Sequence, residues 1–193
     1  MKIVLASQSP RRRELLERMG IEAFEICPAT DEETAPAGLT PDRLVEYLSA
    51  EKARQVAGRF GQEDLIIAAD TVVAVDDRVL GKPHSRDEAV EMLTTLSGRD
   101  HAVYTGVTVC RGDVVCTEHE CTRVTFRPLT EAEIEAYVDT NEPMDKAGSY
   151  GIQGLGSLLV KGIEGDYYNV MGLPVCRLGQ MLRRVGFDVW KRE

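Results

Sequence analysis

Hydrophobic and polar positions divide the chain into alternating strand-like and helix-like segments. Residues 65–75, LIIAADTVVAV, are β-branched and almost continuously apolar, which is typical of a strand covered on both faces. Residues 101–127 alternate like an antiparallel ribbon, with Gly112-Asp113 as the turn. The apolar runs at 2–6 and 157–163 predict two further strands.

Helix start signals fall between these strands. A Ser or Thr followed by Pro occurs at Ser9-Pro10 and Thr40-Pro41, which suits an N-cap and a first helical position. Capping boxes, a Ser or Thr with a Glu three residues later, begin at Ser85 and Thr130. Because strands and helices alternate around one long hairpin, the sequence predicts a mixed α/β fold. The expected helices run from Pro10 to Met19, from Pro41 to about Arg59, from Ser85 to about Leu96, from Thr130 to about Val138, and onward from Pro174.

Composition narrows the classes of partner. The chain of 193 residues is 43% hydrophobic, which allows a substantial core in one domain or two closely joined lobes. Its formal net charge of -9 argues against an extended nucleic-acid track but leaves room for a small polyanion in a local basic pocket. The start MKIVLASQSP has no signal-peptide pattern and no run approaches the ~20 apolar residues that span a bilayer, so we expect a cytoplasmic protein without membrane association. Five scattered cysteines without a Cys-x-x-Cys pair predict reduced thiols.

Asp70 is a carboxylate inside the most apolar segment of the sequence. Burying an ionised carboxylate is unfavourable unless a cation, a metal ion or hydrogen-bond donors compensate it. A strand-end aspartate that caps a neighbouring helix is the structural alternative. The functional interpretation is a general base or a metal ligand that activates water.

Two lysines occupy unusual positions. Lys52 lies on the same helical face as Val45, Leu48 and Val56, so its ammonium group either extends to solvent or meets an anion. Lys82 stands between a glycine and a proline, and the proline favours an extended backbone that can direct the side chain across a cleft. A solvated loop lysine is the alternative for Lys82.

The segment ASQSPRRR combines a helix N-terminus with arginines. Ser7 and Ser9 lie at a strand-to-helix turn, and Arg11 and Arg12 follow in the first helical turn. The partial positive charge at a helix N-terminus repels arginine side chains. Arginines and the unpaired N–H groups of the first turn can, however, bind a phosphate together, so their presence here favours an anion site. The alternative, a solvated basic face, stays open for Arg13 and for one of the other two. No Walker-type phosphate loop occurs in the chain.

Three other patterns are weak by themselves. Acidic residues at 31–33 could bind Mg²⁺ or Mn²⁺, although acidic loops are usually only solvated. The glycine-rich stretch 148–156, GSYGIQGLG, could let the backbone approach a base or a phosphate. Cys116, His119 and Cys121 match no common zinc motif, so a structural role is favoured there.

Seven fragments follow one another along the chain: ASQSPRRRELL, TDEE, SAEKA, AADTVV, GKP, DKAGSYGIQG and YYNVMGLPV. In that order and spacing the chain resembles the Maf family of nucleoside triphosphate pyrophosphatases, from Leu5 to about Leu182. Each fragment alone is weak, whereas the collinear set is specific. Asp70, Lys52 and Lys82 are also positions that the family pattern marks as functional.

The resemblance implies an elongated, two-lobed fold similar to that of inosine triphosphate pyrophosphatases, with a nucleotide cleft between the lobes and often a homodimer. It implies a hydrolase that splits a nucleoside triphosphate between the α- and β-phosphates with the help of Mg²⁺ or Mn²⁺. It further implies that Ser7, Arg12, Lys52 and Lys82 bind the triphosphate, that Glu32 and Asp70 bind the metal ion, and that Asp70 accepts the proton of the attacking water.

The resemblance also bears on the base. Arg11, Thr71 and Gln153 are similar to the residues of the branch that prefers dTTP and UTP, whereas the 7-methyl-GTP branch has Trp, Gln and Glu there. Ser149 stands where the dTTP branch often has Ala. Two other classes of function remain: a nucleotide-binding regulator of septum formation with little turnover, and a nucleic-acid-binding module. The acidic balance and the lack of stacking aromatic residues near the arginines count against the second.

Overall fold

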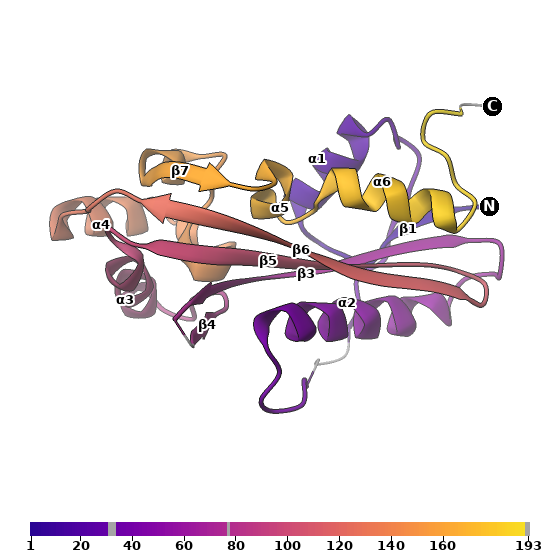
Figure 1. Ribbon diagram of the computed structural model, residues 1–193, viewed down its shortest axis with the longest axis horizontal. Helices are drawn as coiled ribbons and strands as arrows, with labels where there is room; N and C mark the ends of the chain where they lie inside the picture. The colour runs from indigo at the N-terminus through magenta and orange to yellow at the C-terminus, as the bar shows by residue number, and fades with distance from the viewer. Residues whose placement is uncertain (31–33, 77, 192–193) are drawn as a thin grey trace. The chain divides into compact units, whose positions relative to one another are not determined.

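A computed structural model describes residues 1–30, 34–76 and 78–191 of the chain. Strands and helices alternate along it, as Figure 1 shows. The elements in chain order are β1 (Ile3–Leu5), α1 (Pro10–Arg18), β2 (Glu25–Ile26), α2 (Pro41–Ala57), β3 (Leu65–Val75), β4 (Arg78–Leu80), α3 (Arg86–Leu96), β5 (Asp100–Arg111), β6 (Val114–Phe126), α4 (Glu131–Val138), the 3-10 helices η1 (Glu142–Asp145), η2 (Ala147–Ser149) and η3 (Leu155–Leu158), β7 (Val160–Glu164), α5 (Tyr167–Met171) and α6 (Val175–Arg184).

The strands form a mixed sheet in the order β2-β1-β3-β5-β6-β7, with β4 paired to β3. Strand β1 is parallel to both β2 and β3, whereas β3 with β4 and β6 with β7 are antiparallel. The mixed α/β fold predicted from the sequence is confirmed by this topology.

The chain divides into two compact units. Strands β3, β5 and β6 contribute residues to both units. Unit 1 comprises Met1–Asp70, Thr105–Glu120 and Gly172–Glu193, and unit 2 comprises Thr71–Tyr104 and Cys121–Met171.

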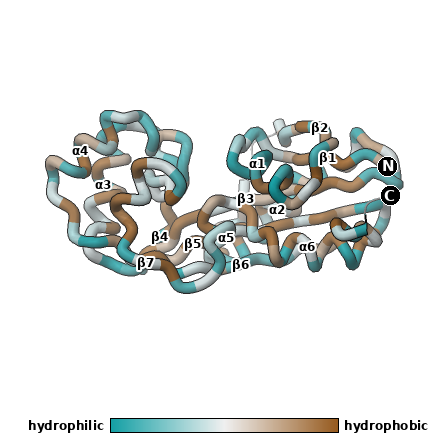
Figure 2. The backbone as a smooth tube through the Cα atoms, turned by 90° about the horizontal axis from the view of Figure 1, so that it is seen from above, coloured by the Kyte–Doolittle hydropathy of each residue, from teal (hydrophilic) through white to brown (hydrophobic). Residues whose placement is uncertain are grey.

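In unit 1, α2 lies along one face of the sheet and α1 and α6 lie along the opposite face (Figure 1). The face under α2 contains buried hydroxyls, because Thr108 of β5 hydrogen-bonds to Ser49 of α2 and to Thr117 of β6, each at 2.9 Å. Helix and sheet approach closely at Gly106, where an added Cβ would lie 2.1 Å from the carbonyl oxygen of Val45. Figure 2 shows the hydrophobic character of the central strands that these helices cover. One core cluster of this unit consists of Val4, Ala6, Ala53, Val56, Ile66, Ala68 and Cys110.

In unit 2, helices α3 and α4 pack on a core shared with β3, β5 and β6. Its centre is aromatic: the rings of His101, Phe126 and Tyr150 meet edge to face at centroid distances of 4.7 to 5.4 Å. The other large buried members of this core are Val73, Val75, Leu80, Met92, Leu93, Leu96, Val103, Val124, Ile134, Tyr137, Val138 and Leu159.

Local details differ from the sequence predictions. Ser9 and Thr40 occupy N-cap positions, but neither side chain makes the capping hydrogen bond. Thr130 forms the complete capping box with Glu133, whereas Ser85 caps α3 while Glu88 accepts instead from the amide of His84 at 2.7 Å. The predicted last strand begins only at residue 160, because the preceding residues form η3, and helix α5 was not predicted. No helix among the described residues is long and apolar enough to cross a membrane.

Candidate functional site

The buried strand β3 is interrupted at one place. Asp70 and Thr71 are partly exposed, and every other residue of the strand is buried. Asp70 forms an ion pair with Lys52 of α2, with 2.5 Å between the lysine Nζ and the aspartate Oδ1. Their side chains are 16% and 19% exposed, so the pair is accessible from solvent but mostly desolvated. The ammonium group of Lys52 therefore meets an anion, and two residues that the sequence singled out separately lie together.

A second cluster lies at the turn between β1 and α1. The hydroxyl of Ser7, a buried residue, accepts hydrogen bonds from Arg12 Nη1 at 3.1 Å and from the amide of Ser9 at 3.2 Å. The Nε of Arg12 donates to the carbonyl of Gly172 at 2.8 Å, which holds the guanidinium group at this turn. Arg13 instead pairs with Glu17 on the exposed face of the helix. The structure thus separates Arg12, held at the turn, from Arg13, a surface residue.

Of the remaining described candidates, Arg11 is a half-buried residue of α1 in unit 1, and Lys82, Thr71 and Gln153 belong to unit 2. Lys82 is exposed, and the carbonyl of the preceding Gly81 accepts a hydrogen bond from the amide of Gly148 at 3.0 Å. Gly148 has φ +67° and packs on β3, since an added Cβ would lie 2.7 Å from a methyl carbon of Val73. The backbone of the Lys82 loop and the start of the glycine-rich segment are therefore fixed to each other and to β3. Thr71 is partly exposed and Gln153 is exposed.

Of the two predicted metal ligands, the structure describes Asp70 but not Glu32. Glu32 and its neighbours at 31 and 33 lie outside the described residues. Within the described ranges, no group of three or more His, Cys, Asp or Glu side chains could hold a metal ion. His119 is paired with Glu46 of α2 at 2.8 Å between Nδ1 and Oε1, which agrees with the structural role favoured for it.

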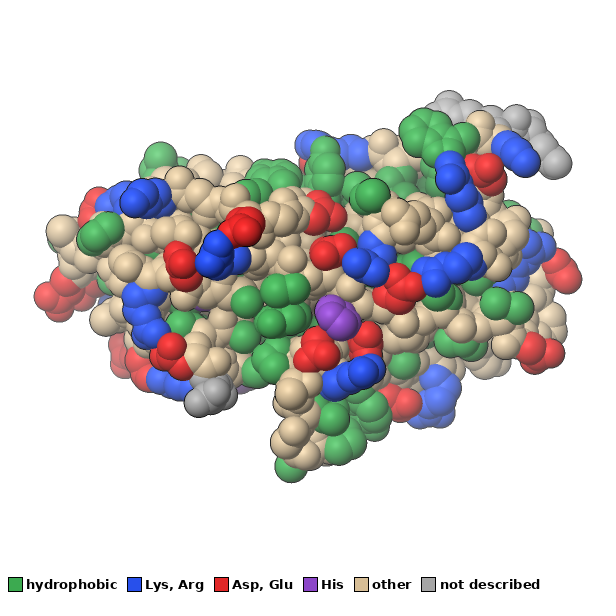
Figure 3. All heavy atoms as spheres, viewed as in Figure 1, with side chains coloured by type: hydrophobic (Ala, Val, Ile, Leu, Met, Phe, Trp, Pro, Cys, Tyr) green, Lys and Arg blue, Asp and Glu red, His purple; other side chains and the backbone are tan. Residues whose placement is uncertain are grey.

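Several charged side chains outside these clusters form ion pairs between β6 and α6. On the face opposite α2, Glu118 of β6 bonds Arg177 and Arg184 of α6, and Glu120 accepts from Arg177 at 3.0 Å. Figure 3 shows acidic and basic side chains interspersed over the α6 region of the surface. Because side chains alternate along a strand, Glu118 and Glu120 face α6 while Thr117 and His119 face α2.

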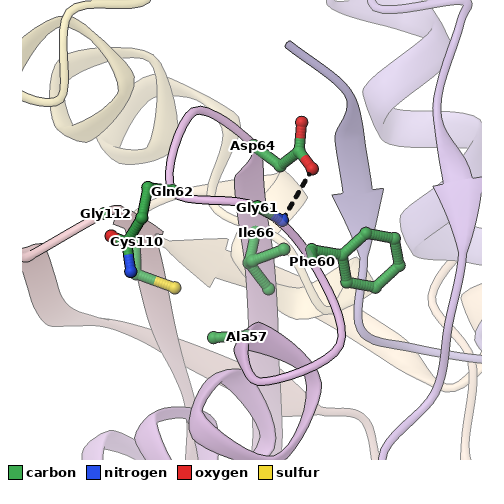
Figure 4. A pocket seen from close by; sticks show the side chains of 8 residues that line it. All are labelled: Ala57, Phe60, Gly61, Gln62, Asp64, Ile66, Cys110 and Gly112. Carbon is green, nitrogen blue, oxygen red and sulfur yellow. Dashed lines mark hydrogen bonds between the residues drawn. The ribbon is translucent and has the colours of Figure 1, made fainter.

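A recess in unit 1 lies away from these residues (Figure 4). It is bordered by the end of α2 and by the loop before β3, where Asp64 accepts from the amide of Gly61 at 3.0 Å. Burial raises the pKa of the Cys110 thiol at its wall. None of the predicted site residues lines this recess, whose lining residues are Ala57, Phe60, Gly61, Gln62, Asp64, Ile66, Cys110 and Gly112.

Comparison with known proteins matches the chain over nearly its whole length. The dTTP/UTP pyrophosphatase of Pelotomaculum thermopropionicum is 51% identical over 190 residues, covering 97% of this chain and 98% of that protein. The dTTP/UTP pyrophosphatase of Moorella thermoacetica is 54% identical over 194 residues, covering 99% and 98%. Among solved structures, a HAM1 protein from Coxiella burnetii has the same fold, with a TM-score of 0.55 at 16% identity over 95% of this chain and 99% of that one. Because the model of the family described as Maf-like protein also matches residues 2–185, the chain belongs to the Maf family.

Proposed function

We propose that this protein hydrolyses nucleoside triphosphates, with dTTP and UTP preferred, to the monophosphate and pyrophosphate. The observation that carries the proposal is the ion pair between Asp70, which lies at the partly exposed interruption of a buried strand, and Lys52 of α2. The family membership supports it, and relatives about half identical to this chain are named dTTP/UTP pyrophosphatase.

The phosphates are assigned to the cationic and hydroxyl groups. Arg12, Lys52 and Lys82 carry fixed positive charge, and charge-assisted hydrogen bonds to phosphate oxygens are about twice as strong as neutral ones. The bond between Arg12 and the hydroxyl of Ser7 keeps both groups at the N-terminus of α1, where the helix dipole favours an anion. Because phosphates are common to all nucleotides, these contacts supply affinity without selecting the base.

Asp70 is assigned the role of general base. Its carboxylate takes the proton of the water that attacks the phosphorus, while the bond to the leaving pyrophosphate breaks. Lys52 holds the carboxylate in place through the 2.5 Å contact and contributes positive charge beside the reacting phosphate. This role accounts for a carboxylate within the otherwise apolar strand β3.

A divalent cation fits the donor chemistry of this site. Mg²⁺ and Mn²⁺ take oxygen ligands, and Mg²⁺ usually needs only one or two carboxylates with water and substrate phosphates. Asp70 supplies such a carboxylate, and Glu32 is assigned as its companion ligand. When bound, the ion would neutralise negative charge on the phosphate oxygens.

Base selection is assigned to Arg11, Thr71 and Gln153. The Gln153 side chain is exposed, and its amide can both donate to and accept from the carbonyl and N3–H edge of thymine or uracil. A mismatched base leaves such polar groups unpaired, which costs about 1–3 kcal/mol for each group. The alternative function, a nucleotide-binding regulator of septum formation with little turnover, is not favoured.

The test measures pyrophosphate release from dTTP, UTP, ATP and GTP at a fixed Mg²⁺ or Mn²⁺ concentration. We expect kcat/KM to be higher for dTTP and UTP, and Asp70→Asn to lower turnover by about 10²-fold or more while the fold is retained. Asp113→Asn, at the exposed hairpin turn, is the matched control and should behave as the unmodified protein. Near-normal turnover in folded Asp70→Asn would refute the catalytic role, and equal kcat/KM for dTTP and GTP would refute the base preference.

A further inference from the structure

The glycine-rich segment is wrapped around one carboxylate of its own unit. Glu142 accepts hydrogen bonds from the amide of Leu155 at 2.9 Å and from the amide of Gly156 at 3.0 Å. It also accepts from the hydroxyl of Tyr137 at 2.9 Å, and that hydroxyl accepts from the amide of Gly151 at 3.1 Å. Both ends of the segment 151–156 are therefore tied to one side chain, either directly or through Tyr137.

We call these hydrogen bonds of Glu142 and Tyr137 to the segment 151–156 the Glu142 clamp. The glycines of this segment make room for the clamp. An added Cβ at Gly154 would lie 2.4 Å from a carboxylate oxygen of Glu142, and one at Gly156 would lie 2.6 Å from the hydroxyl of Tyr137. At Gly151 the Cβ would lie 2.5 Å from the side chain of Lys146. All three clashes are with the protein itself. The glycine spacing is thus explained by close packing around Glu142 and its neighbours, without any ligand.

The electrostatics of the clamp favour an ionised Glu142. Burial opposes ionisation, but the amides of Gly156 and Leu155, the Tyr137 hydroxyl and the charge of Lys146 together hold the pKa of Glu142 below its usual range. Burial is also the main cause that raises the pKa of Tyr137, so its hydroxyl stays protonated and keeps donating to Glu142. A carboxylate with several donors is a strong, directional anchor for a loop.

We propose that Glu142 is the positioning residue that sets base selectivity by holding the segment that carries Gln153. Tyr137 assists by connecting Glu142 to the amide of Gly151 through its hydroxyl group. The inference rests on the proposed function, because it concerns how the base is read. Gln153 lies between the two anchored ends and its side chain is exposed, whereas Gly151 and Gly156 are buried. A side chain on a short segment fixed at both ends keeps its amide in one place, and a hydrogen-bonding site discriminates only when its groups are held in place.

The first measurement is backbone amide hydrogen exchange in peptides that cover residues 151–158. Glu142→Gln replaces one acceptor oxygen with a donor, so the amides of Leu155 and Gly156 cannot both be satisfied, and we expect exchange to become about tenfold faster or more. Glu135→Gln, an exposed position on the neighbouring helix α4, controls for the lost charge and should leave this exchange unchanged. Unchanged exchange in Glu142→Gln would overturn the clamp.

The second measurement is the ratio of kcat/KM for dTTP to that for GTP. We expect Glu142→Gln to lower this ratio by about tenfold, mainly through dTTP, and to cause little further change on a Gln153→Ala background, because Glu142 acts through Gln153. Tyr137→Phe removes the hydroxyl that connects Glu142 to Gly151 but leaves the carboxylate, so it should lower the ratio less. This variant replaces Glu142→Gln in the test if Glu142→Gln does not fold.

The outcomes separate the two ideas. A purely structural role would reduce the rates with dTTP and GTP by the same factor, and that result would overturn the assignment of Glu142 to base selectivity. An additive loss in the double variant would overturn it as well. If the unmodified protein releases no pyrophosphate from any triphosphate, the proposed function fails while the exchange experiment still decides the clamp.

Discussion

Acidification should destabilise unit 2 through His101. This imidazole is 4% exposed, its Nε2 lies 2.8 Å from the hydroxyl of Tyr150, and its Nδ1 has no hydrogen-bond partner among the described residues. Burial lowers the pKa of His101 from 6.5 to about 4, only partly opposed by the charge of Asp100. A proton added at Nδ1 would place a positive charge among the rings of Phe126 and Tyr150 without an acceptor.

The sign follows from where the proton binds. Between pH 6.5 and about pH 4 the unfolded chain binds a proton at His101 and the folded chain does not, so stability is lost as the pH falls through this window. At about 1.4 kcal/mol for each pKa unit, the total loss is about 3 kcal/mol, and about 2 kcal/mol of it is reached by about pH 5. Above pH 6.5 both states are neutral at this residue and the contribution vanishes.

The assay compares urea unfolding of the unmodified protein and of His101→Gln at about pH 7.5 and about pH 5. Far-UV circular dichroism is the appropriate signal, because the one tryptophan, Trp190, is 82% exposed and belongs to unit 1. His101→Gln loses packing at both pH values, but the difference in unfolding free energy between the two proteins should shrink by about 2 kcal/mol on acidification. His84→Gln, at an exposed position, controls for the loss of one imidazole. If the two stability curves stay parallel, the argument about His101 is wrong.

Other predictions use matched pairs of positions. Gly106→Ala should destabilise unit 1 by about 1–3 kcal/mol or more, since its Cβ would meet the backbone of α2 at 2.1 Å. Gly179→Ala, in open space within α6, should stabilise by about 1 kcal/mol, and urea unfolding distinguishes the two. Arg12→Ala should impair pyrophosphate release with every triphosphate, whereas Arg13→Ala should change stability by less than about 0.5 kcal/mol and retain activity. Lys82→Ala should lower kcat/KM by about tenfold or more for all bases alike, and a change confined to one base would move Lys82 to the base pocket.

Long, strongly patterned elements were predictable from the sequence. The bounds of β3 agree with the apolar run at 65–75, and α4 begins and ends where the Thr130 capping box and the apolar pattern place it. Short elements were not, because their backbone is determined by tertiary contacts. The 3-10 turn η3, for example, is fixed by hydrogen bonds to Glu142 from 13 and 14 residues along the chain, and no local pattern encodes such a distant anchor.

The candidate site shows the same division. Asp70 and Lys52 could be singled out because a charge on an apolar strand or helix face violates the local pattern. Their contact could not be predicted, since it depends on how α2 lies on β3. Glu142 was missed for the opposite reason: in the sequence it is an ordinary acidic residue next to a proline, and only the glycines that pack against it mark its role.

The Lys52–Asp70 pair limits what substitutions at these positions can prove. Each partner compensates the other for lost hydration, so removing one leaves a mostly buried, uncompensated charge. Such a charge is strongly destabilising when burial is complete. The destabilisation is smaller here, because the side chains of Asp70 and Lys52 are 16% and 19% exposed. Under the proposed roles, a loss of turnover in a Lys52 variant therefore combines a weaker phosphate contact with a displaced Asp70. Lys82 has no such confounding role, because it is an exposed loop residue whose neighbours are held through the backbone of Gly81. The proposed contribution of a lysine to phosphate binding is thus measured more cleanly at Lys82. The loss of turnover at Lys52 in excess of that value reports how far Asp70, the proposed general base, depends on its partner.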